Sequence, residues 1–329
     1  MVTEKDRIPG ARFLLTGGAG FIGSNLTANL LNNPQVSEVT VLDNLATGFE
    51  RNIEEFKSNE KFKFVIGDIR DSSLCENLTK GMDAICHQAA LGSVPRSIAD
   101  PMKSHDVNVN GFLNILNAAK LNGVKRIVYA SSSSVYGDLN ESPKVESRVG
   151  KILSPYAATK MTNELYAEAF AKAYGMTIVG LRYFNVFGPK QDPNGAYAAV
   201  VPLFIKAGLT NTPPTINGDG TITRDFTPIE NVVQINTKAL LSENLEPAKH
   251  YVFNVACGQT TDLNTLWELV KTATNANVDP LYGANRPGDI FFSLADVSYA
   301  MEQLNYIPNT NLKLAIEQAV IDYKLRYAF

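Results

Sequence analysis

The first half of the chain alternates short apolar runs with longer segments that have room for helices. The apolar runs are RFLLTG, EVTVLDN, KFKFVIGD, DAICHQAA, VKRIVYASS and MTIVGLRYF. Apolar and polar residues do not strictly alternate within them, which is typical of parallel strands buried on both faces. The pattern therefore predicts an α/β fold in which helices cover a parallel sheet.

Two of the longer segments carry apolar residues at helical spacing. FIGSNLTANLLNN, directly after the first strand, places Ile22, Leu26 and Leu30 on one side of a helix. DVNVNGFLNILNAAKLNG predicts one long helix, and its expected buried side consists of Phe112, Leu113, Leu116 and Ala119.

The alternation loosens after Tyr183, where Gly, Pro and Asn become frequent, as in GPKQDPNGAYAAV and NTPPTINGDGT. Such segments favour loops and short elements. We expect a first domain over residues 1–183, to which residues 229–257 return, and a smaller C-terminal α/β cap over 184–329.

Composition and charge narrow the classes of function that are expected for this protein. The chain has 329 residues, 45% of them hydrophobic, and a formal charge of −3, which gives no reason to expect a nucleic-acid partner. No apolar run is long enough to span a membrane, so we expect a soluble, cytoplasmic protein. The three cysteines (Cys75, Cys86 and Cys257) are interpreted as free buried thiols, and three scattered histidines do not favour a metal site.

A glycine-rich turn follows the first strand. Gly17, Gly20 and Gly23 stand between that strand and a helix, where they let the backbone approach a pyrophosphate at the helix N-terminus. The second strand ends at Asp43, whose carboxylate can accept hydrogen bonds from ribose hydroxyls and would repel a 2′-phosphate. These features predict a Rossmann-type, doubly wound sheet that binds NAD rather than NADP.

Two further strand ends belong to the predicted cofactor site. Asp68 and Ile69 close the third strand, where they could meet the adenine, although Asp68 could equally cap a helix. Ala89 and Ala90 follow the fourth strand, where they would lie near the middle of the cofactor.

The segment SPYAATK places Tyr156 and Lys160 four residues apart, behind a Ser-Pro pair typical of a helix start. An ammonium beside a phenol stabilises the phenolate, so we expect a pKa for Tyr156 below the usual value of about 10. A tyrosine of that kind can act as a general base near neutral pH. The fifth strand ends in SSSSVYG, which brings hydroxyls to the edge of the sheet where ligands bind, and together these features predict a catalytic site.

Long strings of the chain are familiar: HQAALGSVPRSIADP, SPYAATKMTNELYA, GLRYFNVFGPKQDPNGAYAAVVP and INGDGTITRDF. With them the chain resembles the extended short-chain dehydrogenase/reductase family, from about Arg12 to about Tyr306. Within that family it is most similar to the UDP-sugar 4-epimerases, in particular to bacterial UDP-N-acetylglucosamine 4-epimerases.

The resemblance implies an isomerase with tightly bound NAD that interconverts UDP-N-acetylglucosamine and UDP-N-acetylgalactosamine through a 4-keto intermediate, and that could also accept UDP-glucose and UDP-galactose. Tyr156 would take the proton of the sugar 4-hydroxyl, Ser132 would supply the catalytic hydroxyl, and Lys160 would bind the nicotinamide ribose. The resemblance extends the cofactor site to a further set of residues: Phe21, Ile22, Asn44, Thr47, Gly48, Asn108 and Tyr183.

The resemblance also implies UDP-sugar contacts. Arg224 and Arg286 would clamp the diphosphate, which suits the bidentate donors of arginine. The other expected contacts are Ser93, Ser133, Ser134, Asn185, Ala199, Val200, Asn217, Asp289 and Ser293. A homodimer, paired through the helices that begin near Ser97 and Ser154, is a further expectation from the family.

Ser293 bears on which sugar is accepted. It stands where epimerases confined to glucose and galactose have a bulky tyrosine, so the smaller side chain leaves room for an N-acetyl group. Two alternatives stay open. UDP-glucuronate 4-epimerases and decarboxylases share the site, and so would a non-catalytic NAD-binding sensor. A nucleotide-sugar 4,6-dehydratase would need an Asp-Glu pair where this chain has Ser133-Ser134.

Overall fold

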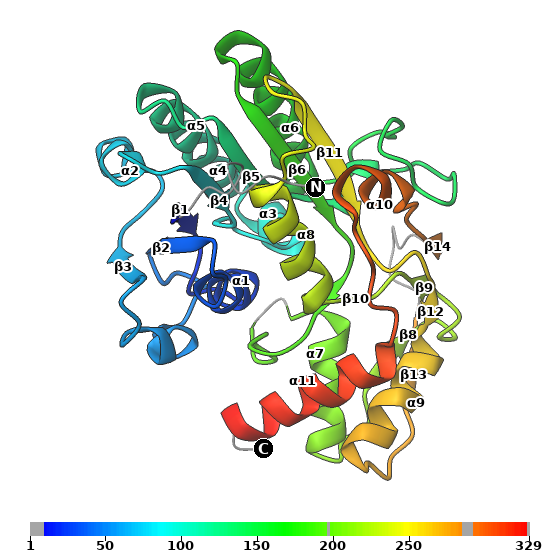
Figure 1. Ribbon diagram of the computed structural model, residues 1–329. Coiled ribbons are helices and arrows are strands. Elements are labelled where there is room, and N and C mark those ends of the chain that lie inside the picture. Colours follow the sequence, from blue (N-terminus) through cyan, green and yellow to red (C-terminus); the bar gives the residue numbers. More distant parts are fainter. Residues whose placement is uncertain (1–9, 196–197, 285–291, 328–329) are drawn as a thin grey trace. The chain divides into compact units, whose positions relative to one another are not determined.

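The computed structural model contains a seven-stranded sheet (Figure 1) and describes residues 10–195, 198–284 and 292–327. The strands, in sheet order, are β11 (His250–Val255), β6 (Thr177–Tyr183), β5 (Arg126–Ser132), β4 (Ala84–His87), β1 (Ala11–Thr16), β2 (Val36–Asp43) and β3 (Phe62–Ile66). The pairs β1–β2, β1–β4, β2–β3 and β4–β5 are parallel. The predicted Rossmann-type sheet is thereby confirmed, with the order of strands reversing between β1 and β4.

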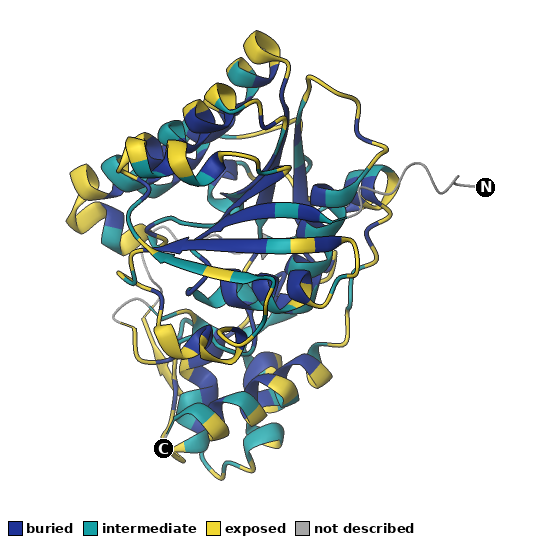
Figure 2. Ribbon diagram, turned by 60° about the vertical axis from the view of Figure 1, so that its left-hand side comes forward, coloured by how far each residue is buried: buried dark blue, intermediate teal, exposed yellow. Residues whose placement is uncertain are grey.

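Helices cover both faces of this sheet. They are α1 (Phe21–Leu31), α2 (Ser72–Thr79), α3 (Val94–Ala99), α4 (Pro101–His105), α5 (Gly111–Leu121), α6 (Pro155–Tyr174) and α8 (Ile229–Leu241). On one face, Leu14 and Ile85 pack in a single core with Phe112 of α5 and Ala167 of α6. On the other face, α1 and α8 are joined by a 2.8 Å hydrogen bond from Thr237 Oγ1 to Asn29 Oδ1. The strands are mostly buried and the outer sides of the helices exposed (Figure 2).

The predicted helix over residues 106–123 differs from the observed structure in one respect. A π-helical turn, η4 (Asp106–Asn110), separates α4 from α5. Phe112, Leu116 and Ala119 are buried as predicted, whereas Leu113 is half-buried. Three 3-10 turns complete this part of the chain: η2 (Glu50–Asn52), η3 (Glu54–Phe56) and η5 (Ser133–Tyr136).

A second core lies among α7 (Val200–Leu209), α9 (Leu263–Thr274) and α11 (Leu312–Arg326). Phe204 meets Trp267 edge to face at 5.7 Å between ring centroids. The remaining elements are short: β7 (Val186–Phe187), β8 (Thr215–Asn217), β9 (Thr223–Arg224), β10 (Thr227–Pro228), β12 (Thr261–Asp262), β13 (Leu281–Gly283), β14 (Phe292–Ser293) and α10 (Ser298–Leu304). The strands among them form three small sheets, β10–β7, β12–β9–β14 and β13–β8.

The chain divides into two compact units. The first comprises Met1–Val135, Ile152–Arg182 and Val233–Phe253, and the second Tyr136–Lys151, Tyr183–Val232 and Asn254–Phe329. The segment that returns to the first unit, expected over 229–257, is Val233–Phe253. The expected boundaries also differ at residues 136–151, which belong to the second unit. The reason is backbone pairing, because Lys144 N donates to Leu294 O and Asp296 N donates to Lys144 O.

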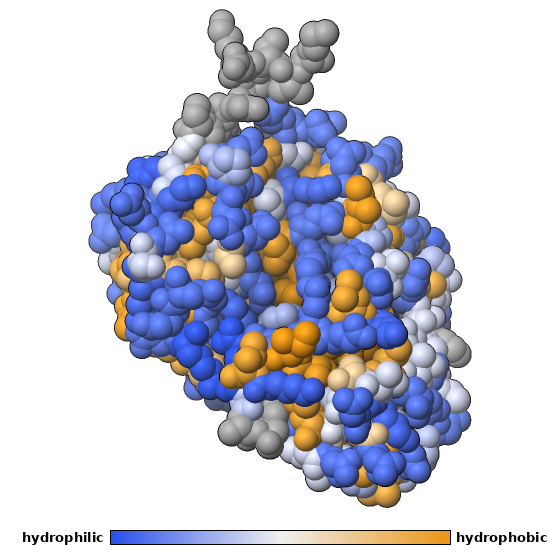
Figure 3. Space-filling view, turned by 60° about the horizontal axis from the view of Figure 1, so that its bottom comes forward, coloured by the Kyte–Doolittle hydropathy of each residue, from blue (hydrophilic) through white to orange (hydrophobic). Residues whose placement is uncertain are grey.

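None of the helices in the described part of the chain is long and apolar enough to cross a membrane. The face seen in Figure 3 is largely hydrophilic, with hydrophobic residues in smaller clusters.

Candidate active site

The glycine-rich turn between β1 and α1 has no room for a side chain at Gly17 or Gly23. A Cβ on Gly23 would lie 2.1 Å from Gly17 O, and one on Gly17, whose φ is +74°, would lie 2.7 Å from Ala89 N. Helix α1 starts at Phe21 with Gly20 as its N-cap, without a side-chain cap and without an acidic residue in its first turn. Its N-terminal N–H groups therefore form a side-chain-free cradle of the kind that accepts a phosphate, which fits a dinucleotide cofactor.

Asp43, at the end of β2, is buried beside this turn. Its Oδ2 accepts from Ala19 N at 2.9 Å and its Oδ1 from Leu45 N at 2.8 Å. Burial raises the pKa of Asp43, and its backbone hydrogen bonds oppose that shift. The carboxylate thus ties the glycine turn to the loop after β2, and it keeps free lone pairs for a further donor such as a ribose hydroxyl.

The loop after β2 carries three more predicted cofactor residues. Gly48 is buried against the glycine turn, because a Cβ there would lie 2.8 Å from Ala19 C. Asn44 and Thr47 are exposed, and Asn44 Nδ2 donates to Asp68 Oδ2 at 2.8 Å.

Asp68 and Ile69 follow β3. Hydrogen bonds from the Arg70 side chain hold the pKa of Asp68 well below its usual range. Asp71, rather than Asp68, caps α2 by accepting from Leu74 N, so the interpretation of Asp68 as a helix cap is wrong. The Ile69 side chain lies in the core with 5% of its surface exposed, so only its backbone remains for a ligand.

The buried side-chain amide of Asn108 holds the loop after β4. Asn108 Oδ1 accepts from Leu91 N at 2.7 Å, and its Nδ2 donates to Leu91 O and to Thr159 Oγ1. The predicted cofactor residue Asn108 therefore shapes the loop that carries Ala89 and Ala90. Both alanines are half-buried.

The predicted catalytic residues come together in the first unit. Tyr156 and Lys160 lie on α6, and Ser132 is the last residue of β5. Ser132 acts on Tyr156 as a hydrogen-bond partner that lowers the pKa of the phenol. Lys160 Nζ lies 6.0 Å from the centroid of the Tyr156 ring and donates to Ala130 O at 2.7 Å. The grouping of serine, tyrosine and lysine follows from packing α6 against β5.

The expected lowering of the Tyr156 pKa is wrong for the protein on its own. Burial raises the pKa of Tyr156 above its usual value, against the opposing effect of the Ser132 hydrogen bond. Burial also lowers the pKa of Lys160, to about 8. The sequence argument counted the positive charge of the lysine but not the removal of the phenol from water.

Three predicted substrate serines lie in the same unit. Ser134 Oγ is buried and has no hydrogen-bond partner among the described residues, so it is available to a ligand, and Ser133 precedes it in η5. Ser93, the N-cap of α3, has a φ of +105°, a backbone conformation rare for serine. Such strain is found where a loop is held for function.

The second unit brings three predicted substrate residues together. In the small sheet, Arg224 of β9 is the register partner of Ser293 of β14. Asn185, with a φ of +35°, donates from Nδ2 to Asp225 O at 3.1 Å, one residue from Arg224. One short sheet and the loop beside it therefore hold an amide, a guanidinium and a small hydroxyl side chain.

The other predicted residues of the second unit lie on separate elements. Ala199 is the N-cap of α7 and Val200 its first residue, Asn217 ends β8, and Tyr183 ends β6. Arg286 and Asp289 lie outside the described residues.

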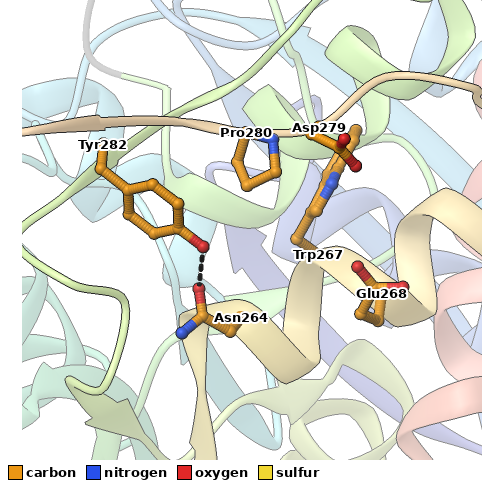
Figure 4. A pocket seen from close by; sticks show the side chains of 6 residues that line it. All are labelled: Asn264, Trp267, Glu268, Asp279, Pro280 and Tyr282. Atoms are coloured by element: carbon orange, nitrogen blue, oxygen red, sulfur yellow. Dashed lines mark hydrogen bonds between the residues drawn. The ribbon is translucent and has the colours of Figure 1, made fainter.

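A pocket of about 260 Å³ opens between α9 and the segment that leads into β13 (Figure 4). Its lining includes Trp267, Glu268 and Tyr282, and the Tyr282 hydroxyl donates to Asn264 Oδ1 at 2.9 Å. No predicted site residue lines this pocket.

Sequence reasoning missed two buried carboxylates. Glu164 lies four residues after Lys160 on the same helix face, so helical spacing could have found it. Asp225 is fully buried and accepts from the backbone N–H groups of Cys257 and Gly258. Its partners are distant in the sequence, so no local signal indicated them.

Comparison with known proteins shows to which family the chain belongs. The model of the NAD dependent epimerase/dehydratase family matches residues 13–256. A putative UDP-glucose 4-epimerase of Methanocaldococcus jannaschii is 37% identical over 309 residues, which cover 93% of this chain and 96% of that protein.

Two solved structures are similar over nearly the whole chain. The UDP-N-acetylglucosamine 4-epimerase from Methanobrevibacter ruminantium M1, in complex with UDP-N-acetylmuramic acid, has a TM-score of 0.91 at 35% identity, with 97% of this chain and 99% of that chain covered. The UDP-glucuronic acid 4-epimerase from Bacillus cereus, in complex with UDP-glucuronic acid and NAD, has a TM-score of 0.88 at 29% identity, with coverage of 96% and 100%. The chain belongs to the NAD-dependent epimerase/dehydratase family.

Proposed function

We propose that this protein interconverts UDP-N-acetylglucosamine and UDP-N-acetylgalactosamine by inverting C4 of the sugar. The chain is a NAD-dependent UDP-sugar 4-epimerase, an isomerase, as its relatives are. The assignment of N-acetylated sugars as substrates rests on one observation. The small, half-buried Ser293 stands in register with Arg224, the expected diphosphate clamp. A hydroxymethyl group at this place leaves space that a tyrosine would fill.

The cofactor would be held by the cradle of Gly17, Gly20 and Gly23 and by the carboxylate of Asp43. Phe21, Ile22, Asn44, Thr47, Gly48, Asp68, Ile69, Ala89, Ala90, Asn108 and Tyr183 complete the proposed cofactor site. When bound, NAD supplies a hydride acceptor and donor, and its oxidised ring carries a positive charge.

The chain's own residues move the proton. Tyr156 takes the proton of the 4-hydroxyl as general base and returns it to the 4-keto sugar, while Ser132 bridges the phenol and the substrate oxygen. Because burial raises the pKa of Tyr156, the base depends on positive charge in the site, and Lys160 provides one such charge. With a pKa of about 8, Lys160 is mostly protonated at neutral pH.

UDP would be bound mainly by residues of the second unit. Arg224 and Arg286 neutralise the diphosphate, and Asn185 donates to it. The other proposed contacts are Ser93, Ser133, Ser134, Ala199, Val200, Asn217 and Asp289. The unpartnered, buried Ser134 Oγ supports a polar ligand group at the end of β5.

A second candidate is the epimerisation or decarboxylation of UDP-glucuronate. The similarity to the Bacillus cereus enzyme favours it, because a carboxylate also needs room and polar partners. A sensor that binds NAD without turnover would not need Ser132, Tyr156 and Lys160 together.

We also propose a homodimer that pairs through α3, α4 and α6. Ile98 is 63% exposed, Met102 79% and Leu165 66%, and the three helices pack on one another. Apolar side chains so exposed on adjacent helices favour a protein partner. The cytoplasm is the proposed location, consistent with three free, buried cysteines, and the product would serve polysaccharide synthesis.

Incubation of the purified enzyme with UDP-N-acetylglucosamine, with and without added NAD, tests this function. The anomeric proton signal of UDP-N-acetylgalactosamine should appear in the NMR spectrum. Turnover without added NAD would show that the cofactor stays bound through purification. Conversion of UDP-glucuronate or UDP-galactose alone would contradict the proposed substrate, and no conversion of any of them would favour the sensor.

A further inference from the structure

Three successive residues of β5 contact three successive turns of α6. The Ala130 carbonyl accepts from Lys160 Nζ at 2.7 Å, and Ser131 Oγ donates to Glu164 Oε1 at 2.6 Å. Ser132 acts on Tyr156 as a hydrogen-bond partner that lowers the pKa of the phenol. Because Tyr156, Lys160 and Glu164 are spaced four residues apart, their side chains share one face of α6. Glu164 thus occupies the same strand–helix contact as the catalytic residues, one turn further from the reacting end.

Glu164 is held in a single orientation. Arg182 of β6 donates from Nε to Oε1 at 2.9 Å and from Nη2 to Oε2 at 2.8 Å. The side chains of Arg182 and Glu164 are only 4% and 7% exposed. Counting the bond from the Ser131 hydroxyl, the Glu164 carboxylate accepts three hydrogen bonds. Its negative charge is therefore fixed in place and shielded from water.

Lys160 needs a negative partner because it is buried. Removal from water lowers its pKa to about 8, and the charge of Glu164 acts in the opposite direction. His87 of β4 is a titratable group affected by the charge of Lys160. It is uncharged at neutral pH, because burial and the positive charge of Lys160 lower its pKa to about 3. Around Glu164 lie Arg182 and the aromatic groups of Tyr129 and His250. Glu168, the next acid along α6, pairs with His250 and Lys172.

We propose that Glu164 is a positioning residue of the reaction: clamped by Ser131 and Arg182, its carboxylate keeps Lys160 protonated beside Tyr156 at neutral pH. This inference rests on the proposed proton transfer by Tyr156 but holds for any UDP-sugar substrate. Arg182, by contrast, holds Glu164 and has no direct contact with Lys160 in the described hydrogen bonds.

The test compares Glu164→Gln with Arg182→Gln. Both substitutions break the same buried ion pair and carry a similar structural cost. Only the first removes the negative charge that lies one helical turn from Lys160. A Glu164→Asp variant keeps the charge, and the double variant Glu164→Gln/Arg182→Gln replaces the pair by two amides, which provides a folded protein if either single variant does not fold.

Two readouts are measured on the NAD-loaded enzyme. The first is the pH profile of kcat with the UDP-sugar that the wild type converts. The second, independent of turnover, is the titration of Tyr156, followed by NMR of protein labelled at tyrosine Cζ and assigned with Tyr156→Phe. If the wild type converts no UDP-sugar, the proposed function fails, whereas the tyrosine titration still tests this inference.

We expect Glu164→Gln and the double variant to move the alkaline fall of kcat to lower pH by on the order of one unit. In the Tyr156 titration, the shift change that accompanies loss of the Lys160 proton should move to lower pH in the same variants. Arg182→Gln and Glu164→Asp should not move this fall to lower pH. Equal shifts in Glu164→Gln and Arg182→Gln would overturn the proposal, and so would lower thermal stability with unchanged pH profiles, since either result would make Glu164 a structural partner only.

Discussion

Ser293 and Arg224 are register partners in the parallel pair β14–β9. The backbone of the strand holding Ser293 is fixed further on, where Ala295 N donates to the buried carboxylate of Asp225 and Asp296 N to Lys144 O. A larger side chain at position 293 therefore cannot move away from Arg224 by a shift of the strand.

Ser293→Tyr should abolish turnover of UDP-N-acetylglucosamine while UDP-galactose is still converted. The phenol would fill the space that the acetamido group needs. Initial rates for both substrates, measured by NMR, check this, with Ser293→Thr as the matched control that retains both activities. Loss of both activities, or of neither, would contradict a role of Ser293 in sugar selection.

Tyr156→Phe should lower kcat by roughly a thousandfold, because it removes the hydroxyl that transfers the proton. Ser132→Ala should have a smaller effect, on the order of a hundredfold, since the phenol stays. Tyr166→Phe is the control, because Tyr166 lies on the same helix and is 37% exposed. A Tyr156→Phe enzyme with the kcat of the wild type would exclude Tyr156 as the base.

Gly23→Ala should weaken NAD binding at least tenfold (roughly 1.4 kcal/mol) and lower the melting temperature. Its Cβ would lie 2.1 Å from Gly17 O and 2.7 Å from Gly18 Cα, so the backbone of the cradle must shift. Gly195→Ala is the control, since among the described residues its Cβ would have only Asp192 Oδ2 within 4 Å, at 3.9 Å. Calorimetric NAD titration measures the effect, and equal affinities for both variants would disprove the close packing of the cradle.

Asp225 should make stability depend on pH. Burial raises its pKa from 3.8 to about 6, with its backbone hydrogen bonds opposing the shift. Between these two values the folded state binds more protons than the unfolded state. The contribution of Asp225 to the free energy of unfolding therefore falls as pH rises through this window, by about 3 kcal/mol in total.

Urea unfolding of the wild type and of Asp225→Asn between pH 4 and pH 7 measures this dependence. The difference in free energy of unfolding, wild type minus variant, should be largest near pH 4 and should decrease toward pH 7. A difference that does not change with pH would show that Asp225 has the same pKa in both states.

Leu165→Asp should convert the proposed dimer into monomers, because it puts a charge into the apolar surface of α6. Leu325→Asp is the matched control: Leu325 is 83% exposed on α11, outside the proposed interface. Sedimentation velocity of the two variants and the wild type measures whether each is a dimer or a monomer. If the wild type is already monomeric, or if Leu325→Asp dissociates it instead, the proposed interface is wrong.

The sequence alone was enough to predict the sheet and the proposed catalytic group. The strands were predicted because parallel strands buried on both faces need continuous apolar runs, and β1, β2, β4, β5 and β6 have them. The glycine cradle and the pair Tyr156–Lys160 were found because the residues that form them are neighbours along the chain.

Tertiary structure decided what depends on distant residues and on burial. Asn108 packs under the loop after β4, residues 136–151 join the second unit, and Asp225 binds segments far apart in sequence. The protonation of Tyr156 and Lys160 also follows from packing, because the cost of removing a charge from water depends on what surrounds it. Spacing along a helix places two side chains together, but only the packed environment sets their charges.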